Sequence, residues 1–323
     1  MSTDKLAFIQ NHMNHTLQAV ENPKPTARGK VRDIFSTEKE IFLVASDRVS
    51  AFDVILGTIP LKGAMLTHQA CYWLDKVKDI VPTHLIERPD AQIMRCHKAK
   101  PLMVEMVVRG YLAGSLAREP AETRGQKYGL KLDPSLQNYQ AFETPIITPT
   151  TKAEQGEHDM PCSMQDLIND GALTAKQADE LSEITMNLFN AGQAFASEQD
   201  LILVDTKYEF GLVDDKIVLI DEIHTADSSR YWKKGTYNDR VAQGEAPDML
   251  DKERLRRWLM SEHDYKGEGT APALTEDIRT DLSSHYWELT ELLTGEAFNA
   301  PTEMATERVR SVEHWQERSE HEF

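Results

Sequence analysis

The stretch LVDTKYEFGLVDDKIVLIDE, Leu203 to Glu222, is the part of the sequence that decides the fold. It is typical of two hydrophobic strands joined by a tight turn, yet charged residues recur inside it. Because alternate side chains of a strand share a face, Asp205, Lys207 and Glu209 are predicted to project together. The opposite face is predicted to carry Val204, Thr206, Tyr208 and Phe210. Both strands are hydrophobic on both faces, which implies burial, and buried charges need partners.

The register of this hairpin decides where its carboxylates lie. If residues 214–216 form a three-residue loop, Glu209 lies opposite Asp221 on the same face, with Cβ atoms about 4.5–5.5 Å apart. A two-residue loop at 214–215 puts the two side chains on opposite faces instead. Two carboxylates at that spacing repel unless a cation lies between them, so we interpret the pair as a Mg²⁺ site that carries nucleotide phosphates, with Lys207 beside them. A polar, solvated strand face with a Lys–Glu pair is the alternative.

The composition is that of an acidic globular protein. The 323 residues include 36 Lys and Arg against 53 Asp and Glu, which gives a net charge of −17. That charge argues against nucleic acid or an anionic membrane as the main partner, and no apolar run approaches the ~20 residues of a membrane helix. The N-terminus has no signal-peptide core, and the three distant cysteines indicate neither a disulfide framework nor zinc. We therefore expect a cytoplasmic protein; its oligomeric state stays open, and a monomer is compatible with the sequence.

The order of patterns along the chain predicts an α+β protein. Residues 118–162 are rich in Pro, Thr, Gly and charge and predict long loops, whereas Thr174 is expected to cap a helix over 175–198. KVRDIFST, EIFLVASD and FDVILGTIP are predicted to be successive strands of one antiparallel sheet. A helix is expected at Leu66–Ile80, with one side formed by Leu66, Ala70, Trp73, Leu74 and Val77. We expect three units: a β-rich lobe at 1–117, an α+β lobe at 118–237, and a helical extension at 238–323 packed on the second lobe.

A glycine turn near the N-terminus offers groups that bind phosphate. TARGKVRDIF places Gly29, Lys30 and Arg32 where a strand begins. Glycine lets backbone N–H groups approach a phosphate, and the cations add Coulomb attraction. The spacing is not that of a Walker A loop, and a surface turn with solvated cations is the alternative.

Further polar segments are candidates for binding an anionic ligand. VVRGYLAGS combines Arg109 with a Gly-Ser turn at Ser115, and TADSSRYW provides Ser229 and Arg230 just after the hairpin. Arginine binds a carboxylate or a phosphate through two parallel hydrogen bonds. Each segment alone is compatible with a turn and a surface arginine, but both beside a metal site indicate a ligand with phosphate and carboxylate groups. ASDRVSAFD and the loop TPTTKAEQGEHD, which could close over a substrate, add Ser50, Asp53 and Lys152.

Together these motifs resemble the SAICAR synthetase family, the phosphoribosylaminoimidazole-succinocarboxamide synthases of purine (IMP) biosynthesis. LVDTKYEFG is similar to one family signature in full, and EMVVRGYLAGS to most of another. GKVRD, SDRVSAFD, TPTTKAEQGEHD and DSSRYW are similar to family segments in the same order. The resemblance covers Thr26–Trp232, and the helical tail is similar to the longer form of the family. Met103 stands where the family usually has proline, two residues before Glu105.

The resemblance implies an ATP-dependent ligase. It would join L-aspartate to the carboxylate of CAIR, 5-amino-1-(5-phospho-D-ribosyl)imidazole-4-carboxylate, giving SAICAR, ADP and phosphate through an acyl phosphate. Its cofactors would be ATP and Mg²⁺. The implied fold is related to ATP-grasp enzymes and, in its N-terminal lobe, to protein kinases, with an antiparallel sheet covering the nucleotide. Such phosphoryl transfer relies on positioning and charge neutralisation, so no covalent enzyme nucleophile is required.

The resemblance also implies roles for the candidate residues. Glu209 and Asp221 would hold Mg²⁺. The catalytic cations would be Lys207, Lys30 and Arg230. The nucleotide would contact Gly29, Lys30, Val31, Arg32, Lys98, Glu105 and Lys207. The substrates would contact Arg109, Ser115, Ser229, Arg230, Ser50, Asp53 and Lys152, of which Ser50 and the loop around Lys152 are the candidates for aspartate.

Two other functions are compatible with parts of the pattern. Another ATP-grasp or kinase-like phosphotransferase would share the metal carboxylates without needing both RGYLAGS and DSSR. A non-catalytic nucleotide-binding module would tolerate loss of one metal carboxylate, whereas this chain keeps both. Release of ADP that requires CAIR and aspartate together separates the ligase from both alternatives.

Overall fold

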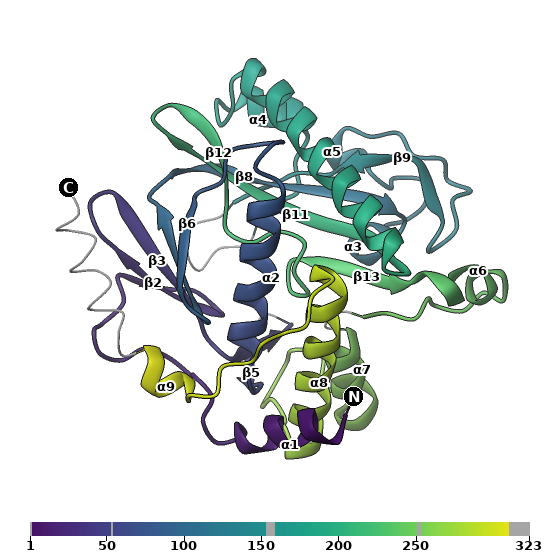
Figure 1. The fold of residues 1–323 in the computed structure, drawn as a ribbon. Helices are drawn as coiled ribbons and strands as arrows, with labels where there is room; N and C mark the ends of the chain where they lie inside the picture. Colours follow the sequence, from purple (N-terminus) through teal and green to yellow (C-terminus); the bar gives the residue numbers. More distant parts are fainter. Residues whose placement is uncertain (1, 53, 153–158, 251–252, 310–323) are drawn as a thin grey trace.

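The structure is a computed structural model that describes residues 2–52, 54–152, 159–250 and 253–309. Two antiparallel sheets form its frame, and helix α2 (Lys62–Lys76) packs against the first of them (Figure 1). The expected helix side formed by Leu66, Ala70, Trp73, Leu74 and Val77 is buried. No helix within these described ranges is both long and apolar enough to span a lipid bilayer.

The first sheet is antiparallel and has the strand order β1-β2-β3-β7-β6. Its strands are β1 (Ala27–Arg28), β2 (Arg32–Ser36), β3 (Glu40–Ala45), β6 (Leu85–Asp90) and β7 (Ile93–His97). The predicted strands KVRDIFST and EIFLVASD are β2 and β3, which pair as expected. The third, FDVILGTIP, is not in this sheet: β5 (Val54–Thr58) pairs with β4 (Arg48–Ala51) in a separate hairpin.

The second sheet has the order β10-β8-β11-β12, with β13 paired to β11 and β9 paired to β8. Its strands are β8 (Lys100–Tyr111), β9 (Ala141–Ile147), β10 (Thr150–Thr151), β11 (Leu201–Val213), β12 (Lys216–Ile220) and β13 (Ser229–Lys233). Part of the region expected to be loop is therefore strand. The two sheets join where the backbone N–H of His84 donates to Leu219 O at 2.9 Å.

The expected lobe boundary after residue 117 divides this second sheet. β8 lies before that boundary and β11 after it, yet the two strands pair along most of their length, from Asp205 opposite Arg109 to Leu212 opposite Lys100. Hydrogen-bonded strands belong to one cooperative unit, so we propose that the second lobe begins near residue 99.

Helices cover the second sheet on one face. The longest is α5 (Ala175–Glu198), which packs on β11 and β8, and α4 (Met164–Asn169) lies beside it. Thr174 is the N-cap of α5, as predicted, and forms a capping box with Gln177. Short helical turns, α3 (Gly114–Ala117) and η1 (Gln126–Tyr128), connect β8 to β9.

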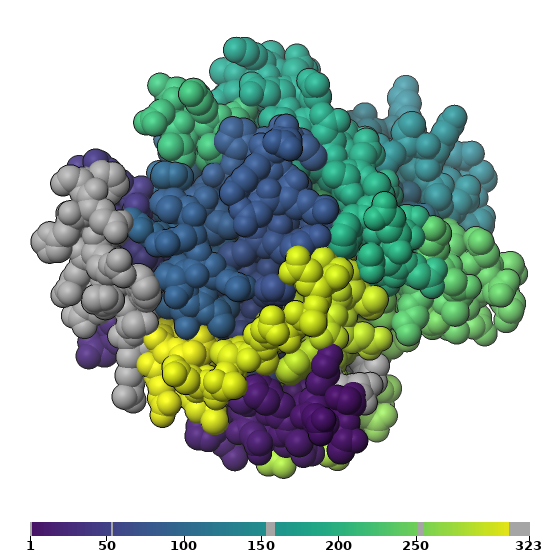
Figure 2. All heavy atoms as spheres, viewed as in Figure 1, coloured from purple at the N-terminus to yellow at the C-terminus, as the bar shows by residue number. Residues whose placement is uncertain are grey.

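The C-terminal helices divide between the two parts of the chain: α6 (Lys234–Ala242) packs on β11 and β13, within the expected 118–237, whereas α8 (Glu276–Thr294) packs on α2, outside it. The others are α7 (Glu253–His263) and α9 (Ala305–Arg308). Helix α8 runs beside α2 and also touches α1 (Thr3–Asn11) (Figure 1). In the space-filling view the yellow C-terminal segment lies between the blue α2 region and the purple N-terminus (Figure 2). Arg279 donates to Thr58 O at 2.8 Å and Ser283 to Pro60 O at 2.8 Å.

Candidate active site

The charged face of β11 is present as predicted. Asp205 and Lys207 are half-buried and Glu209 is buried, whereas Thr206, Tyr208 and Phe210 are buried in alternation with them. The apolar members face the core under α5, and the charged members share a face with side chains of the neighbouring strand β8. The sheet therefore keeps its core on one side and a charged face on the other.

The hairpin adopts the two-residue loop, the second of the two registers that the sequence left open, and not the one on which the Glu209–Asp221 pair depends. Asp214 and Asp215 alone form the loop, with φ of +48° and +60°, so that Val213 pairs with Lys216 and Glu209 with Ile220. Two consecutive residues with positive φ are typical of a type I′ turn, whose twist suits a hairpin. The predicted cross-strand opposition of Glu209 and Asp221 is therefore wrong.

The carboxylate that does lie opposite Glu209 is Glu105 on β8. Lys207 lies between them, with Nζ 2.8 Å from Glu209 Oε1 and 2.6 Å from Glu105 Oε1. Lys152, next to β10, makes a second ion pair with Glu209. Two cations and two carboxylates thus alternate at this end of the face, which removes the repulsion that two opposed carboxylates would have.

These contacts shift the acid–base properties of the cluster. Burial would raise the pKa of Glu209, but the charges of Lys207 and Lys152 outweigh it and lower the pKa to about 2. At Glu105 burial prevails over the attraction of Lys207, and the pKa is raised. Burial opposes the charge of Lys207, yet Glu209 and Glu105 raise its pKa above the usual lysine value. Glu209 is therefore held in its ionised form, and Lys207 is held as a cation.

Asp221 lies just beyond β12, in a left-handed conformation with φ of +64°. It forms an ion pair with Arg32 on β2, and the adjacent Glu222 binds the same guanidinium. This link crosses from the second sheet to the first. His84, whose backbone N–H donates to Leu219 O at the same junction, has its pKa lowered to about 3, first by burial and then by the charge of Arg32.

The carboxylates fit a metal only together with a ligand. Within the described part of the chain, no three His, Cys, Asp or Glu side chains are grouped closely enough to hold a metal ion. Mg²⁺, however, is often bound by one or two carboxylates while phosphate oxygens and water complete its shell. Glu209 and Asp221 are oxygen donors of this kind, and here each is paired with cations, Glu209 with Lys207 and Lys152, and Asp221 with Arg32.

The other end of the face is a cluster of arginines around Asp205. Arg109 lies opposite Asp205, with Nη1 3.5 Å from Oδ2, and Arg230 Nη1 donates to the same oxygen at 3.1 Å. Arg109 Nε also donates to Thr148 Oγ1 at 2.9 Å, and its Nη2 to Ser115 Oγ at 3.3 Å. Arg109, Ser115 and Arg230 thus meet, as predicted, at one place on the sheet.

The glycine turn lies between β1 and β2 and is held from inside the protein. Arg48, which is buried, donates to Lys30 O at 2.8 Å and to Gly29 O at 3.1 Å. Ser46 Oγ donates to Val31 O at 2.8 Å. These bonds fix the carbonyls of the turn inward, while the Lys30 side chain is exposed.

Other predicted residues lie apart from these clusters. Ser229 shares the buried face with Thr206, its Oγ 2.7 Å from Thr206 Oγ1, so it points away from Arg230. Lys98 donates to Thr37 O at 2.9 Å at the edge of the first sheet. Ser50 lies on β4, half-buried. Asp53 and residues 153–158 of the predicted loop fall outside the described residues.

Sequence reasoning gave no role to several residues that hold the site. Asp205 orients both arginines, Thr148 fixes Arg109, and Glu222 shares Arg32 with Asp221. Arg48 supports the glycine turn. The signal that could have found them is a polar residue inside, or directly after, an otherwise hydrophobic strand. Such a residue is buried, and a buried polar group needs a hydrogen-bond partner.

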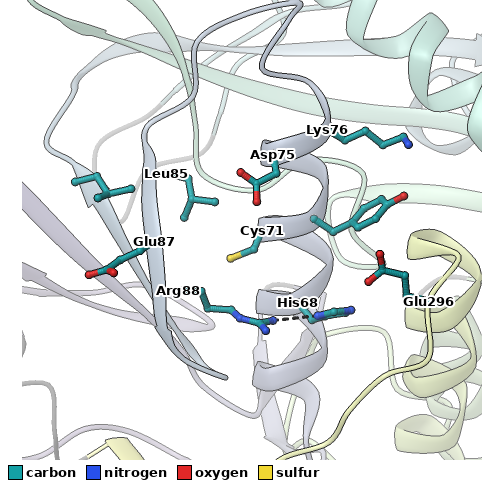
Figure 3. A pocket seen from close by; sticks show the side chains of 10 residues that line it. His68, Cys71, Asp75, Lys76, Leu85, Glu87, Arg88 and Glu296 are labelled. Atoms are coloured by element: carbon teal, nitrogen blue, oxygen red, sulfur yellow. Dashed lines mark hydrogen bonds between the residues drawn. The ribbon is translucent and has the colours of Figure 1, made fainter.

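A separate pocket of about 530 Å³ opens on the outer side of α2 (Figure 3). Its lining includes His68, Cys71, Arg88 and Glu296, and among the described residues none of the predicted site residues takes part. Its charges already have partners: Arg88 Nη1 lies 3.0 Å from His68 Nδ1, and Glu87 pairs with Arg95. We therefore take the strand face, and not this pocket, as the candidate active site.

Comparison with known proteins agrees with this geometry. The family model described as SAICAR synthetase matches residues 25–272. The chain is 45% identical over 279 residues, 85% of its length and 89% of that protein, to phosphoribosylaminoimidazole-succinocarboxamide synthase of Cytophaga hutchinsonii. It is 38% identical over 297 residues, 89% of its length and 94% of that protein, to the protein of the same name in Legionella pneumophila.

Solved structures show the same likeness. The SAICAR synthase of Saccharomyces cerevisiae in complex with SAICAR superposes with a TM-score of 0.77 and is 30% identical, covering 88% of this chain and all of that one. A SAICAR synthetase in complex with ADP superposes with a TM-score of 0.63 at 21% identity and covers 84% of this chain and 99% of that one. The mixed α+β fold described above is therefore that of SAICAR synthases.

Proposed function

Because the chain belongs to the SAICAR synthetase family, we propose how its charged strand face divides the reaction between its two ends. The protein is an ATP-dependent ligase of purine biosynthesis that joins L-aspartate to CAIR. The observation that carries the assignment of roles is the face shared by β8 and β11, which has Glu105, Lys207 and Glu209 at one end. Its other end has Arg109 and Arg230 around Asp205.

We place the nucleotide at the Lys207 end, beside the glycine turn. Arg32 links this turn to Asp221, so Gly29, Lys30 and Val31 adjoin the carboxylates across the gap between the sheets. Lys30 and Lys207 then face the phosphates, and Glu209 and Asp221 hold Mg²⁺, which would neutralise the phosphate charge that develops in transfer. Lys98, at the edge of the first sheet, and Glu105, on β8 beside Lys207, are the proposed contacts of the base.

We place CAIR at the arginine end. Arg109 is fixed by Thr148 and Asp205, so its outer N–H groups are held in one orientation for a planar anion. Ser115 and Arg230 complete this subsite. Ser229 is proposed only as a support of the strand, through Thr206. Ser50 and Lys152 remain the candidates for aspartate, with Asp53 outside the described residues.

The chemistry needs activation of a carboxylate, which is a poor electrophile. An oxygen of the CAIR carboxylate attacks the γ-phosphorus and ADP leaves, giving an acyl phosphate. The amine of aspartate then attacks the acyl carbon, inorganic phosphate leaves, and the nitrogen loses a proton. Every step is served by cations fixed in place, because phosphoryl transfer is mainly positioning and charge neutralisation.

Finer features of the fold and its setting are also proposals. The first sheet would cover the nucleotide in the manner of ATP-grasp enzymes and protein kinases, and the second lobe would carry the metal and substrate groups. We propose the cytoplasm as its location, in keeping with purine biosynthesis.

The test is an assay that couples ADP release to a second enzyme. Release should require CAIR and aspartate together, and the product should be SAICAR. ATP hydrolysis that proceeds without either substrate, or no ADP release with both, would contradict the assignment. The variant Arg230→Lys accompanies this assay, because it keeps the positive charge but removes the planar guanidinium. It should raise the KM for CAIR and leave the KM values for ATP and aspartate near wild type.

A further inference from the structure

The segment between β12 and β13, residues 221–228, brings Asp221 and Arg230 into place from its two ends. Below we refer to it as the 221–228 loop. It is bonded internally: Thr225 Oγ1 donates to Glu222 Oε2 at 2.6 Å, and Ser228 N donates to Thr225 Oγ1 at 3.1 Å. Thr225 and Ala226 are buried, which is unusual for a loop and requires that their polar groups find partners.

One set of partners begins with Asp227. Its Oδ2 lies 2.7 Å from Nζ of Lys62, the first residue of α2, whose side chain is fully buried. Its Oδ1 accepts a hydrogen bond of 2.6 Å from the hydroxyl of Tyr286 on α8. Lys62 Nζ also lies over the Tyr286 ring, 5.4 Å from its centroid. A buried ion pair is stable only when its remaining bonding positions are filled, and Tyr286 fills one of them.

A second set of partners runs in parallel. The backbone N–H of Ala226 donates to Gln69 Oε1 at 2.8 Å, and Gln69 Nε2 donates to Thr290 Oγ1 at 2.7 Å. Gln69 and Thr290 are both fully buried. Tyr286 and Thr290 are four residues apart on α8, so they share the helix face that meets α2. Helix α8 thus reaches two adjacent residues of the loop, once directly and once through α2.

We propose that Tyr286 and Thr290 are positioning residues for the reaction, and that α8 therefore completes the substrate site from behind. This rests on the function proposed above, in which Arg230 binds CAIR. A loop that carries ligand-binding groups must be held close to its productive geometry, and misplacement by a fraction of an ångström lowers the rate. The C-terminal extension supplies that support through Asp227 and Ala226, without touching the ligands itself.

Two conservative variants test the proposal. Tyr286→Phe removes only the hydroxyl and keeps the ring over Lys62. Thr290→Val removes the acceptor of Gln69 together with the hydroxyl's own bond to Tyr286 O at 2.7 Å. Each has a matched control. Tyr265 is a buried tyrosine whose hydroxyl has no hydrogen-bond partner among the described residues, and Thr294 is a buried threonine one turn along α8 that bonds to the carbonyl oxygens of Thr290 and Glu296. The controls are Tyr265→Phe and Thr294→Val.

The measurement is kcat and KM for CAIR, aspartate and ATP, with the melting temperature of each variant. Tyr286→Phe should raise the KM for CAIR about tenfold, the scale for losing a hydrogen bond to a charged group, while the KM for ATP stays near wild type. Thr290→Val should raise the KM for CAIR about threefold, because the bond between Gln69 and Thr290 joins neutral groups. Both controls should keep wild-type values.

Two results would overturn the proposal. One is an unchanged KM for CAIR in Tyr286→Phe. The other is a rise in KM that is equal for CAIR, aspartate and ATP and that parallels the fall in melting temperature, as a purely structural role would give. Failure of the wild-type protein to form SAICAR would instead contradict the proposed function. The two failures are therefore distinguishable.

Discussion

Replacing Gly114 with alanine should displace Arg230 while leaving the sheet intact. Gly114 has a φ of +60°, and a Cβ built on it would lie 2.6 Å from Arg230 Nη1 and 3.0 Å from Nη2. Such contacts force one side to move. The guanidinium is the end of a flexible side chain, so Arg230 should leave its place beside Asp205 Oδ2, 3.1 Å away.

The cost has two parts that a control can separate. An alanine in the left-handed region costs about 1–2 kcal/mol of stability whatever its surroundings. Loss of charge-assisted bonds from Arg230 to CAIR should cost about 1.5–3 kcal/mol of binding, or about 10- to 100-fold in affinity. Gly171 has a φ of +73° and no atom within 4 Å of its added Cβ, so Gly171→Ala carries the first cost without the second.

The assay compares the two variants by thermal unfolding and by titration with CAIR. Both should lose similar stability, because both put alanine at positive φ. Only Gly114→Ala should lose CAIR affinity, and its affinity for ATP should stay near wild type. Equal CAIR affinity in the two variants would show that Arg230 does not depend on the space above Gly114 and would refute the reasoning.

The remaining predictions concern the charged face and its neighbours. Glu209→Gln and Asp221→Asn should each lower turnover at least ~10²-fold and keep the fold, as a titration of activity against Mg²⁺ and a melting curve would show; near-normal activity at limiting Mg²⁺ would argue against the metal role. Arg109→Lys should weaken CAIR binding much more than ATP binding, and calorimetry that finds equal losses would move Arg109 to the nucleotide. Burial lowers the pKa of His84 from 6.5 to about 3, so between these values the unfolded chain binds the extra proton and stability falls as pH decreases. His84→Leu should flatten that fall, and an unchanged pH dependence of the unfolding free energy would contradict it.

Local patterns in the sequence predicted the site better than long-range geometry. Alternation along Leu203–Phe210 placed Asp205, Lys207 and Glu209 correctly on one face, because the two-residue period of a strand is fixed by its backbone. The opposite carboxylate was misassigned. Its true partner, Glu105, is more than a hundred positions away in the chain, and nothing local sets the register between β8 and β11.

The hairpin shows the same limit on a smaller scale. A two-residue loop needs positive φ at both positions, for which asparagine and glycine are the usual signal. Asp214 and Asp215 adopt it here; aspartate is accepted in such turns, but the glycine that usually marks the second position is absent from this pair. The packing partner of α8 was also missed: the expected partner was the second lobe, whereas α8 packs on α2 through contacts such as Gln69 with Thr290, which no local pattern indicates.

The alternation of lysine and glutamate on β8 and β11 has a consequence for which ligands can enter. Before Lys207 or Lys152 can turn to a phosphate, it must leave a carboxylate, so the gain from the new contact is offset by the one given up. A phosphate without a metal ion would leave the buried carboxylate of Glu209 without a counter-ion. When a nucleotide brings its own divalent ion, the lysines can pair with the phosphates while the carboxylate pairs with the ion, so every charge keeps a partner. The charged face should therefore select a nucleotide as much by its bound divalent ion as by its phosphate groups.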